Sequence, residues 1–166
     1  GNLMWQELIS VLSKIVESYH SLLNLSKQKR AALVSVNVPD IERLTKDEEQ
    51  IVTSIGKLEQ IRKKITNQIL SDLKVTEIED SFMDMLALCD KKNADELIKV
   101  HNQLKDILKE VSNSNKINET LIQQALSVVN YNINVMSEAQ ATPTYNANPN
   151  ENTQAKVNKN LFDRLV

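Results

Sequence analysis

Apolar residues from Leu3 to about Val36 recur at steps of three and four, which is the spacing of one face of a helix. The stripe includes Leu8, Leu12, Ile15, Tyr19, Leu22 and Leu33, and it is widened by Ile9, Val16 and Leu23. A stripe of this width is typical of a helix packed in a bundle rather than of a two-stranded coiled coil. The segment contains neither Gly nor Pro, so we expect one unbroken helix.

The run Val36-Asn37-Val38-Pro39-Asp40 predicts a tight turn. Pro39 disfavours helical geometry in the residue before it and fits the first turn of a new helix, with its N-cap near Asn37 or Val38. A second helix is therefore expected from about Pro39 to Leu73, antiparallel to the first because the turn is short. Its predicted seam is Ile41, Leu44, Glu48, Ile51, Ile55, Leu58, Arg62, Ile65 and Ile69.

Two charged residues interrupt this second seam. Glu48 is expected opposite Lys27 and Arg30, and Arg62 is expected near Glu17. Such pairs can set the register between helices. The alternative is that the long side chains keep their charged ends in water at the edge of the bundle.

A short helix is expected from Ser81 to Cys89, with its apolar residues turned inward. These inward residues are Phe82, Met85, Leu86 and Cys89, and Met83 is also interpreted as core filler. The next helix is expected to begin at Asn93-Ala94-Asp95-Glu96, a capping-box arrangement with Asn93 as the N-cap and Glu96 reaching back.

The third long helix is expected from Ala94 to about Glu138. Its seam keeps the same phase across the polar patch at 112–115, so we favour one helix with a polar layer in its middle over two helices broken at 113–115. The predicted seam is Leu97, Val100, Leu104, Ile107, Val111, Ser114, Asn118, Leu121, Ala125, Val128, Asn132 and Val135.

The predicted fold is all-α: an elongated antiparallel bundle, or coiled-coil hairpin, of three long helices and one short helix. We expect residues 1–138 to form one helical domain and residues 139–166 to form a tail. The tail begins with a polar run rich in Asn and Pro, which cannot bury enough apolar surface to fold alone. It finishes in an apolar cluster, so we interpret it as a flexible tether carrying a docking segment, with Leu161, Phe162, Leu165 and Val166 as the docking residues.

Composition and charge agree with a long-helix protein. The 166 residues include two Gly and three Pro, and aromatic residues make up 4%. The 20 basic and 22 acidic residues are mixed along the chain, which argues against nucleic-acid binding. No apolar run reaches the roughly 20 residues of a membrane span, so membrane insertion is not expected. A single cysteine excludes an internal disulfide, which favours a cytoplasmic protein, and Gly1 is interpreted as the remnant of a tag.

Residue patterns typical of catalysis or metal binding do not occur in the sequence. His20 and His101 are isolated, no paired spacing of His, Cys or Glu suits a metal, and the chain lacks a glycine-rich phosphate loop. Cys89 is interpreted as a structural thiol, because Asp90 beside it disfavours the thiolate. We therefore expect no enzyme activity, no catalytic residue, no metal and no cofactor.

Several short patterns along the chain occur together in one known family. They are Leu8-x3-Leu12, Glu17-x-Tyr19, Leu22-Leu23, Ala31-Ala32-Leu33-Val34 before the Val38-Pro39-Asp40 turn and Leu44, Glu48-Glu49, Leu58-Glu59, Arg62, Asn115-x2-Asn118-x2-Leu121-Ile122, Thr144-Tyr145 and the final Leu161-Phe162-Asp163-Arg164-Leu165-Val166. With these patterns the chain resembles the flagellar export chaperones of the FlgN type. It departs from them where Asn146, rather than Gly, follows Tyr145.

The resemblance implies a cytosolic binding protein without catalysis. Its cargo would be the helical termini of hook-associated proteins, which join hook and filament, and it would keep them from assembling early and deliver them to the flagellar export gate. The resemblance also implies that the end of the last helix and the tail contact the cargo, and that Tyr145 serves the gate.

Apolar residues beside the third seam are candidates for this contact, because an amphipathic segment can fill a groove in a bundle. They are Leu126, Val129, Ile133 and Met136. Each of them either binds a partner or packs against the chain's own helices, and the apolar end of the tail either docks on a partner, returns to the bundle or stays free. The alternative function is a structural or regulatory coiled-coil protein that forms a homo-oligomer through the same faces.

Overall fold

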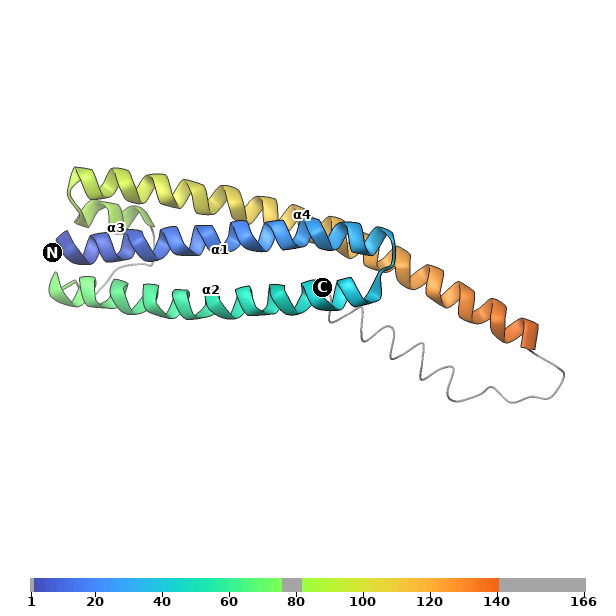
Figure 1. The fold of residues 1–166 in the computed structure, drawn as a ribbon. Helices are drawn as coiled ribbons and strands as arrows, with labels where there is room; N and C mark the ends of the chain where they lie inside the picture. The colour runs from blue at the N-terminus through green and yellow to red at the C-terminus, as the bar shows by residue number, and fades with distance from the viewer. Residues whose placement is uncertain (1, 76–81, 141–166) are drawn as a thin grey trace. The chain divides into compact units, whose positions relative to one another are not determined.

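The computed structural model describes residues 2–75 and 82–140, and within this part of the chain all regular structure is helical (Figure 1). The helices are α1 (Asn2–Val34), α2 (Val38–Asp72), α3 (Phe82–Leu88) and α4 (Lys91–Gln140). The predicted all-α class, with three long helices and a short one, is confirmed. α4 runs without a break through residues 113–115, so the interpretation as one helix is correct.

The turn between α1 and α2 is closed by backbone hydrogen bonds and by a side-chain cap. The N–H of Asn37 donates to the carbonyl of Ala32 (2.9 Å) and that of Val36 to Leu33 (3.2 Å), while Val36 adopts a φ of 50°. These two bonds form a Schellman motif, which ends a helix with a left-handed residue. Asn37 then caps α2, since its Oδ1 accepts from the N–H of Asp40 (3.3 Å) and its Nδ2 donates to the Asp40 carboxylate (3.0 Å). The predicted N-cap near Asn37 is therefore confirmed.

The start of α4 differs from the prediction. Asp90 is the N-cap, because its Oδ1 accepts from the N–H of Asn93 (3.2 Å) and its carbonyl accepts from that of Ala94 (2.9 Å). Asn93 instead lies buried in the first turn, where its side chain accepts from Gln6 Nε2 and donates to Asn2 Oδ1, both at 2.7 Å. The prediction of Asn93 as the cap was wrong because the residue is used for a contact with α1.

The described residues divide into two compact units, to which α1, α2 and α4 each contribute. Unit 1 contains residues 2–24, 48–75 and 82–112, and unit 2 contains residues 25–47 and 113–140. Each unit has its own apolar core.

The core of unit 1 consists of two clusters. The first is formed by Val16, Leu22, Leu23, Ile55, Val100, Ile107 and Val111, and the second by Trp5, Leu8, Ile69 and Leu97. α3 packs against the second cluster through the partly buried Phe82, Met85, Leu86 and Leu88, with Cys89 beyond its end, so the predicted inward face of the short helix is confirmed. Met83 is 71% exposed, so its interpretation as core filler was wrong.

Unit 2 contains the α1–α2 turn and the C-terminal half of α4. Its core joins residues from both sides of the turn to α4, namely Ala32, Leu33, Ile41, Leu44, Ile122, Ala125 and Leu126. Among the described residues, no helix has both the length and the apolar character that crossing a bilayer requires.

Candidate partner-binding site

The C-terminal part of α4 carries large apolar side chains that are exposed in the described part of the chain. Val128 is 54% exposed, Tyr131 68%, Val135 43% and Met136 62%. Val129 and Ile133 lie among them and are half-buried. We call these six residues the distal α4 face. Val128, Tyr131 and Val135 follow the helical steps i, i+3 and i+7, and Val129, Ile133 and Met136 follow i, i+4 and i+7, so they form two adjacent stripes.

The distal α4 face exists because the partner helices of unit 2 end before α4 does. The last shared core residues are Leu33 and Ile41 on either side of the turn, and they pack with Ile122 and Leu126 of α4. α4 continues from there to Gln140, and Figure 1 shows its orange end running past the turn that joins α1 to α2. The apolar pattern of α4 therefore continues beyond the helices that bury its earlier residues.

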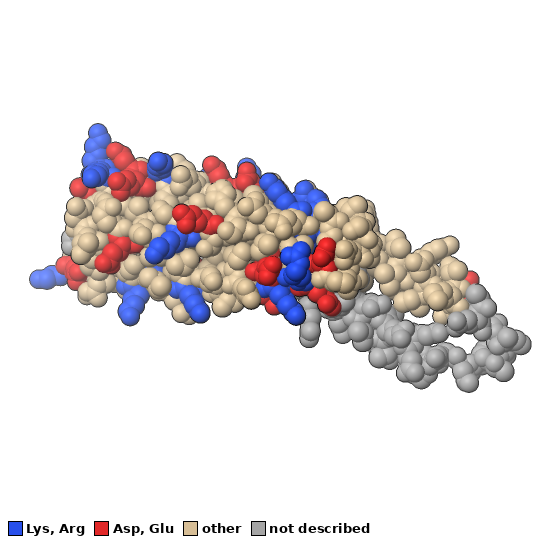
Figure 2. All heavy atoms as spheres, viewed as in Figure 1, with Lys and Arg blue, Asp and Glu red and all other residues tan. Residues whose placement is uncertain are grey.

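This end of α4 is also uncharged. The sequence contains no Asp, Glu, Lys or Arg from Thr120 to Ser137. Figure 2 shows the result as a tan surface over the C-terminal end of α4, whereas charged residues occur over much of the rest of the view. An apolar surface without charge is a poor surface to leave in water and a good one to cover with another apolar segment.

The candidate contact residues on α4 have different environments. Leu126 belongs to the buried core of unit 2, so it packs against the chain's own helices and we leave it out of the proposed surface. Val129 and Ile133 are half-buried, and Met136 is exposed. Tyr145 and the apolar end of the tail (Leu161, Phe162, Leu165 and Val166) lie outside the described residues.

Sequence reasoning missed three residues of the distal α4 face. Val128 and Val135 were assigned to the buried seam, and Tyr131 was not assigned at all. The predicted seam is buried or half-buried through Ala125, but Val128, Asn132 and Val135 are exposed. The signal that was present is the uncharged run around Tyr131, because a helix that faces only water normally carries charges.

A buried polar layer orients α4 against α1 within unit 2. The hydroxyls of Ser26 and Ser114 lie 2.6 Å apart, and Asn118 Nδ2 donates to the carbonyl (2.8 Å) and the hydroxyl (3.0 Å) of Ser26. Arg30 donates to Ser114 Oγ at 2.9 Å and to Asn118 Oδ1 at 3.4 Å. Ser26, Ser114 and Asn118 are buried, so the predicted polar layer is confirmed. Because each buried donor requires its own acceptor, the layer holds α4 in one register and so positions the distal α4 face.

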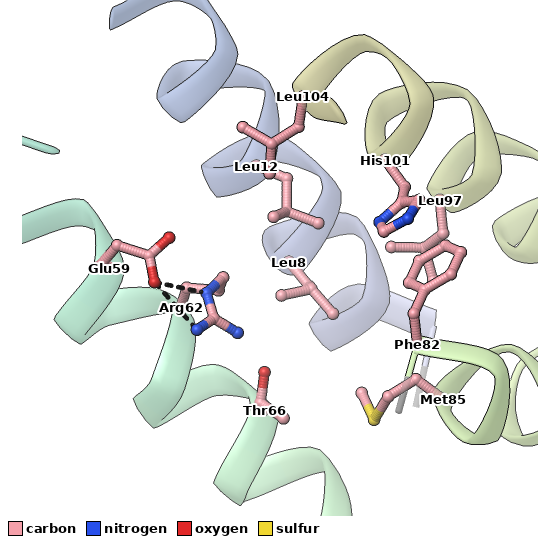
Figure 3. Close-up of a pocket in the computed structure, with 10 residues that line it drawn as sticks. All are labelled: Leu8, Leu12, Glu59, Arg62, Thr66, Phe82, Met85, Leu97, His101 and Leu104. Carbon is pink, nitrogen blue, oxygen red and sulfur yellow. Dashed lines mark hydrogen bonds and ion pairs between the residues drawn. The ribbon is translucent and has the colours of Figure 1, made fainter. Parts of the chain in front are cut away.

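A cavity of about 310 Å³ in unit 1 is lined by residues of α1, α2, α3 and α4 (Figure 3). Its lining is mostly apolar, and the His101 ring stacks on Phe82 with centroids 3.8 Å apart. At its edge Arg62 pairs with Glu59 of its own helix through Nη2 at 2.9 Å and Nε at 3.0 Å, rather than with Glu17 as expected. In the described part of the chain, no cluster of His, Cys, Asp and Glu could hold a metal ion.

Two titratable groups of unit 1 have a raised pKa. Burial raises the pKa of Cys89, and the carboxylate of Asp90 raises it further, which agrees with the predicted structural thiol. Burial also raises the pKa of Tyr19, with a smaller contribution from Glu59. Both shifts favour the neutral form, so neither group is activated as a nucleophile.

Comparison with known families identifies a match that covers most of the chain. The family model described as FlgN protein matches residues 4–153. The match therefore includes both units and the distal α4 face. No curated protein and no solved structure was found to match the chain.

Proposed function

Because the chain belongs to the FlgN family of flagellar export chaperones, we propose that it binds the helical termini of hook-associated proteins in the cytoplasm. Bound there, the termini are kept from assembling early and are delivered to the flagellar type III export gate. The observation that supports this proposal is the distal α4 face, an apolar helical surface that the described residues of its own unit leave exposed. An amphipathic cargo helix is the natural ligand for such a surface, because it buries apolar side chains at the same helical spacing.

The size of the distal α4 face suits a reversible complex. Full burial of one Val, Met or aromatic side chain contributes about 1.5–3 kcal/mol. Four of the six side chains are more than 40% exposed, so much of this free energy is still available to a ligand. Part of it is offset by the cost of ordering a cargo segment. The outcome is binding strong enough to hold cargo and weak enough to release it.

The tail completes the proposed site. The apolar end of the tail contacts the outer side of the bound cargo helix through Leu161, Phe162, Leu165 and Val166. Tyr145 contacts the export gate. Substituting Tyr145 with Ala is then expected to leave cargo binding unchanged while reducing delivery of the cargo. The measurement is the amount of hook-associated protein secreted, compared with the amount recovered in complex with the chaperone. Equal loss of both would contradict a separate role for Tyr145.

Two matched substitutions test the cargo surface. Val135→Asp places a carboxylate in the distal α4 face, whereas Val52→Asp makes the same change at a position of α2 that is also exposed, at 55%. We expect Val135→Asp to weaken binding of a cargo terminal peptide at least about tenfold, which corresponds to about 1.4 kcal/mol. Val52→Asp should bind like the unmodified chain. Isothermal titration calorimetry measures both, and equal affinities would show that cargo binds elsewhere.

The same exposed face also supports the second candidate, a homo-oligomer that associates through α4. Light scattering on the chain alone separates the two functions. A tight dimer that is lost in Val135→Asp, with no binding of any hook-associated peptide, would favour self-association over the chaperone function.

A further inference from the structure

We propose that residues 161–166 dock on the distal α4 face of the same molecule when no cargo is bound, and that a cargo helix must displace them. This deepens the proposed function, and only the identity of the displacing helix rests on it. Two features support this docking: an apolar face on α4 that the other described residues leave exposed, and an apolar segment joined to α4 by residues 141–160.

The segment has the pattern that such a face requires. Leu161, Phe162, Leu165 and Val166 stand at i, i+1, i+4 and i+5, which places all four on one side of a helical turn. Asp163 lies between them on the opposite side. Six residues do not form a stable helix alone in water. A helical turn of this segment therefore requires a surface on which its apolar side chains are buried. The distal α4 face offers two stripes at helical spacing, and a short amphipathic turn can lie along or between them.

The connecting chain is long enough to reach this surface. Residues 141–160 are 20 residues, which as a random coil span about 25 Å and fully extended at most about 70 Å. Val135 and Val128 precede Gln140 by five and twelve residues of helix, or about 8 and 18 Å along the axis. Both distances are shorter than the span of the linker, so the segment can reach either end of the face.

The tether also favours the segment over a second molecule as the occupant. A short flexible link gives an effective concentration in the millimolar range. A second copy of the chain at micromolar concentration competes with this at a large disadvantage. The distal α4 face has no charge that would repel Asp163 or Arg164, and residues 141–160 contain few apolar side chains to compete with those of 161–166.

Docking of the segment would regulate the proposed cargo site. The distal α4 face would be covered between cargo molecules, which lowers the exposure of an uncharged apolar surface to other chains. The apparent Kd for cargo would equal the intrinsic Kd divided by the fraction of molecules in which the segment is not docked. When cargo takes the face, the released segment becomes available for the outer contact proposed above.

Oxidation of methionine gives a test that needs no cargo and no label. Met136 lies in the distal α4 face and Met83 lies on α3, and their exposed fractions are similar at 62% and 71%. We expect deletion of residues 161–166 to speed the peroxide oxidation of Met136 several-fold, with the rate at Met83 unchanged as the internal control. Peptide mass spectrometry measures both rates. Equal rates for Met136 in the full and shortened chains would overturn the inference.

A spin label distinguishes docking within one molecule from docking between molecules. The full chain carries Cys89→Ser and Asp163→Cys with a nitroxide at position 163, and amide signals are recorded by NMR. We expect broadening at residues 128–136, lost when Leu161, Phe162 and Leu165 are changed to Ser and kept when the tether residue Asn158 is changed to Ser. No broadening at these residues would refute intramolecular docking. Broadening of chains that carry no nitroxide, when they are mixed with chains that do, would also refute it, because that contact is between molecules. A cargo peptide that fails to bind would sink the proposed function and leave this result standing.

Discussion

Replacing Asn118 with Ala tests whether the buried polar layer of unit 2 stabilises the position of α4. Asn118 is buried, and its amide donates twice to Ser26 and accepts once from Arg30. Alanine favours the helix, so helix propensity does not oppose the substitution. Any loss of stability must therefore come from the hydrogen bonds and the packing of the amide.

The structure sets the magnitude. The donor bonds to Ser26 are 2.8 and 3.0 Å long, and each contributes about 1 kcal/mol net. The 3.4 Å contact from Arg30 is too long to count fully. A buried Ser26 hydroxyl that loses a partner adds to the cost, although its contact with Ser114 remains. We expect Asn118→Ala to lower the free energy of unfolding by about 2–3 kcal/mol.

Urea unfolding followed by circular dichroism measures this change, with hydrogen exchange of α4 amides as a second probe because the chain has two compact units. Gln124→Ala is the matched control, since Gln124 lies on the exposed side of the same helix. A double-mutant cycle between Ser26→Ala and Asn118→Ala should give a coupling of about 1 kcal/mol. A loss below about 0.5 kcal/mol for Asn118→Ala, with an unchanged urea dependence, would refute a stabilising role for the layer.

Three further substitutions have predictable outcomes. Gly56→Ala should raise the free energy of unfolding by about 1 kcal/mol in urea, because a Cβ at this position of α2 meets nothing within 4 Å, and a loss would contradict this. Val36→Gly should also stabilise, by about 1 kcal/mol, since Val36 has a φ of 50° that glycine adopts without strain; unchanged stability would argue against strain there. Asp90→Asn should lower the pKa of Cys89, which raises its reaction rate with a disulfide reagent at pH 8, while Asn keeps the α4 cap. An unchanged rate would mean that burial alone sets this pKa.

Much of the local structure could be predicted from the sequence, because it depends on neighbouring residues. Pro39 and Asn37 mark the turn, since a proline and an N-cap act within one helical turn of where they stand. The constant phase of the third seam through Ser114 and Asn118 identified α4 as one helix with a polar layer. The uncharged run around Tyr131 also needs no structure to be seen, although its meaning was missed.

Other features were decided by contacts between distant parts of the chain. Asn93 has the sequence context of a cap, but its side chain contacts Gln6 and Asn2, more than 80 residues away. Arg62 was expected near Glu17 on another helix, but it pairs with Glu59, one turn away on its own helix. The periodicity of the sequence does not distinguish between these two partners.

The sequence by itself determined that the chain is a set of long amphipathic helices, because a helical stripe is a property of the helix that carries it. Only the tertiary structure decided where the stripe of α4 stops being core and becomes the distal α4 face. Val128 and Ala125 occupy equivalent places in the pattern, yet Ala125 is buried and Val128 is half exposed. The difference arises because α1 and α2 turn back at residues 35–37 while α4 continues to Gln140, and burial requires a partner helix that reaches as far.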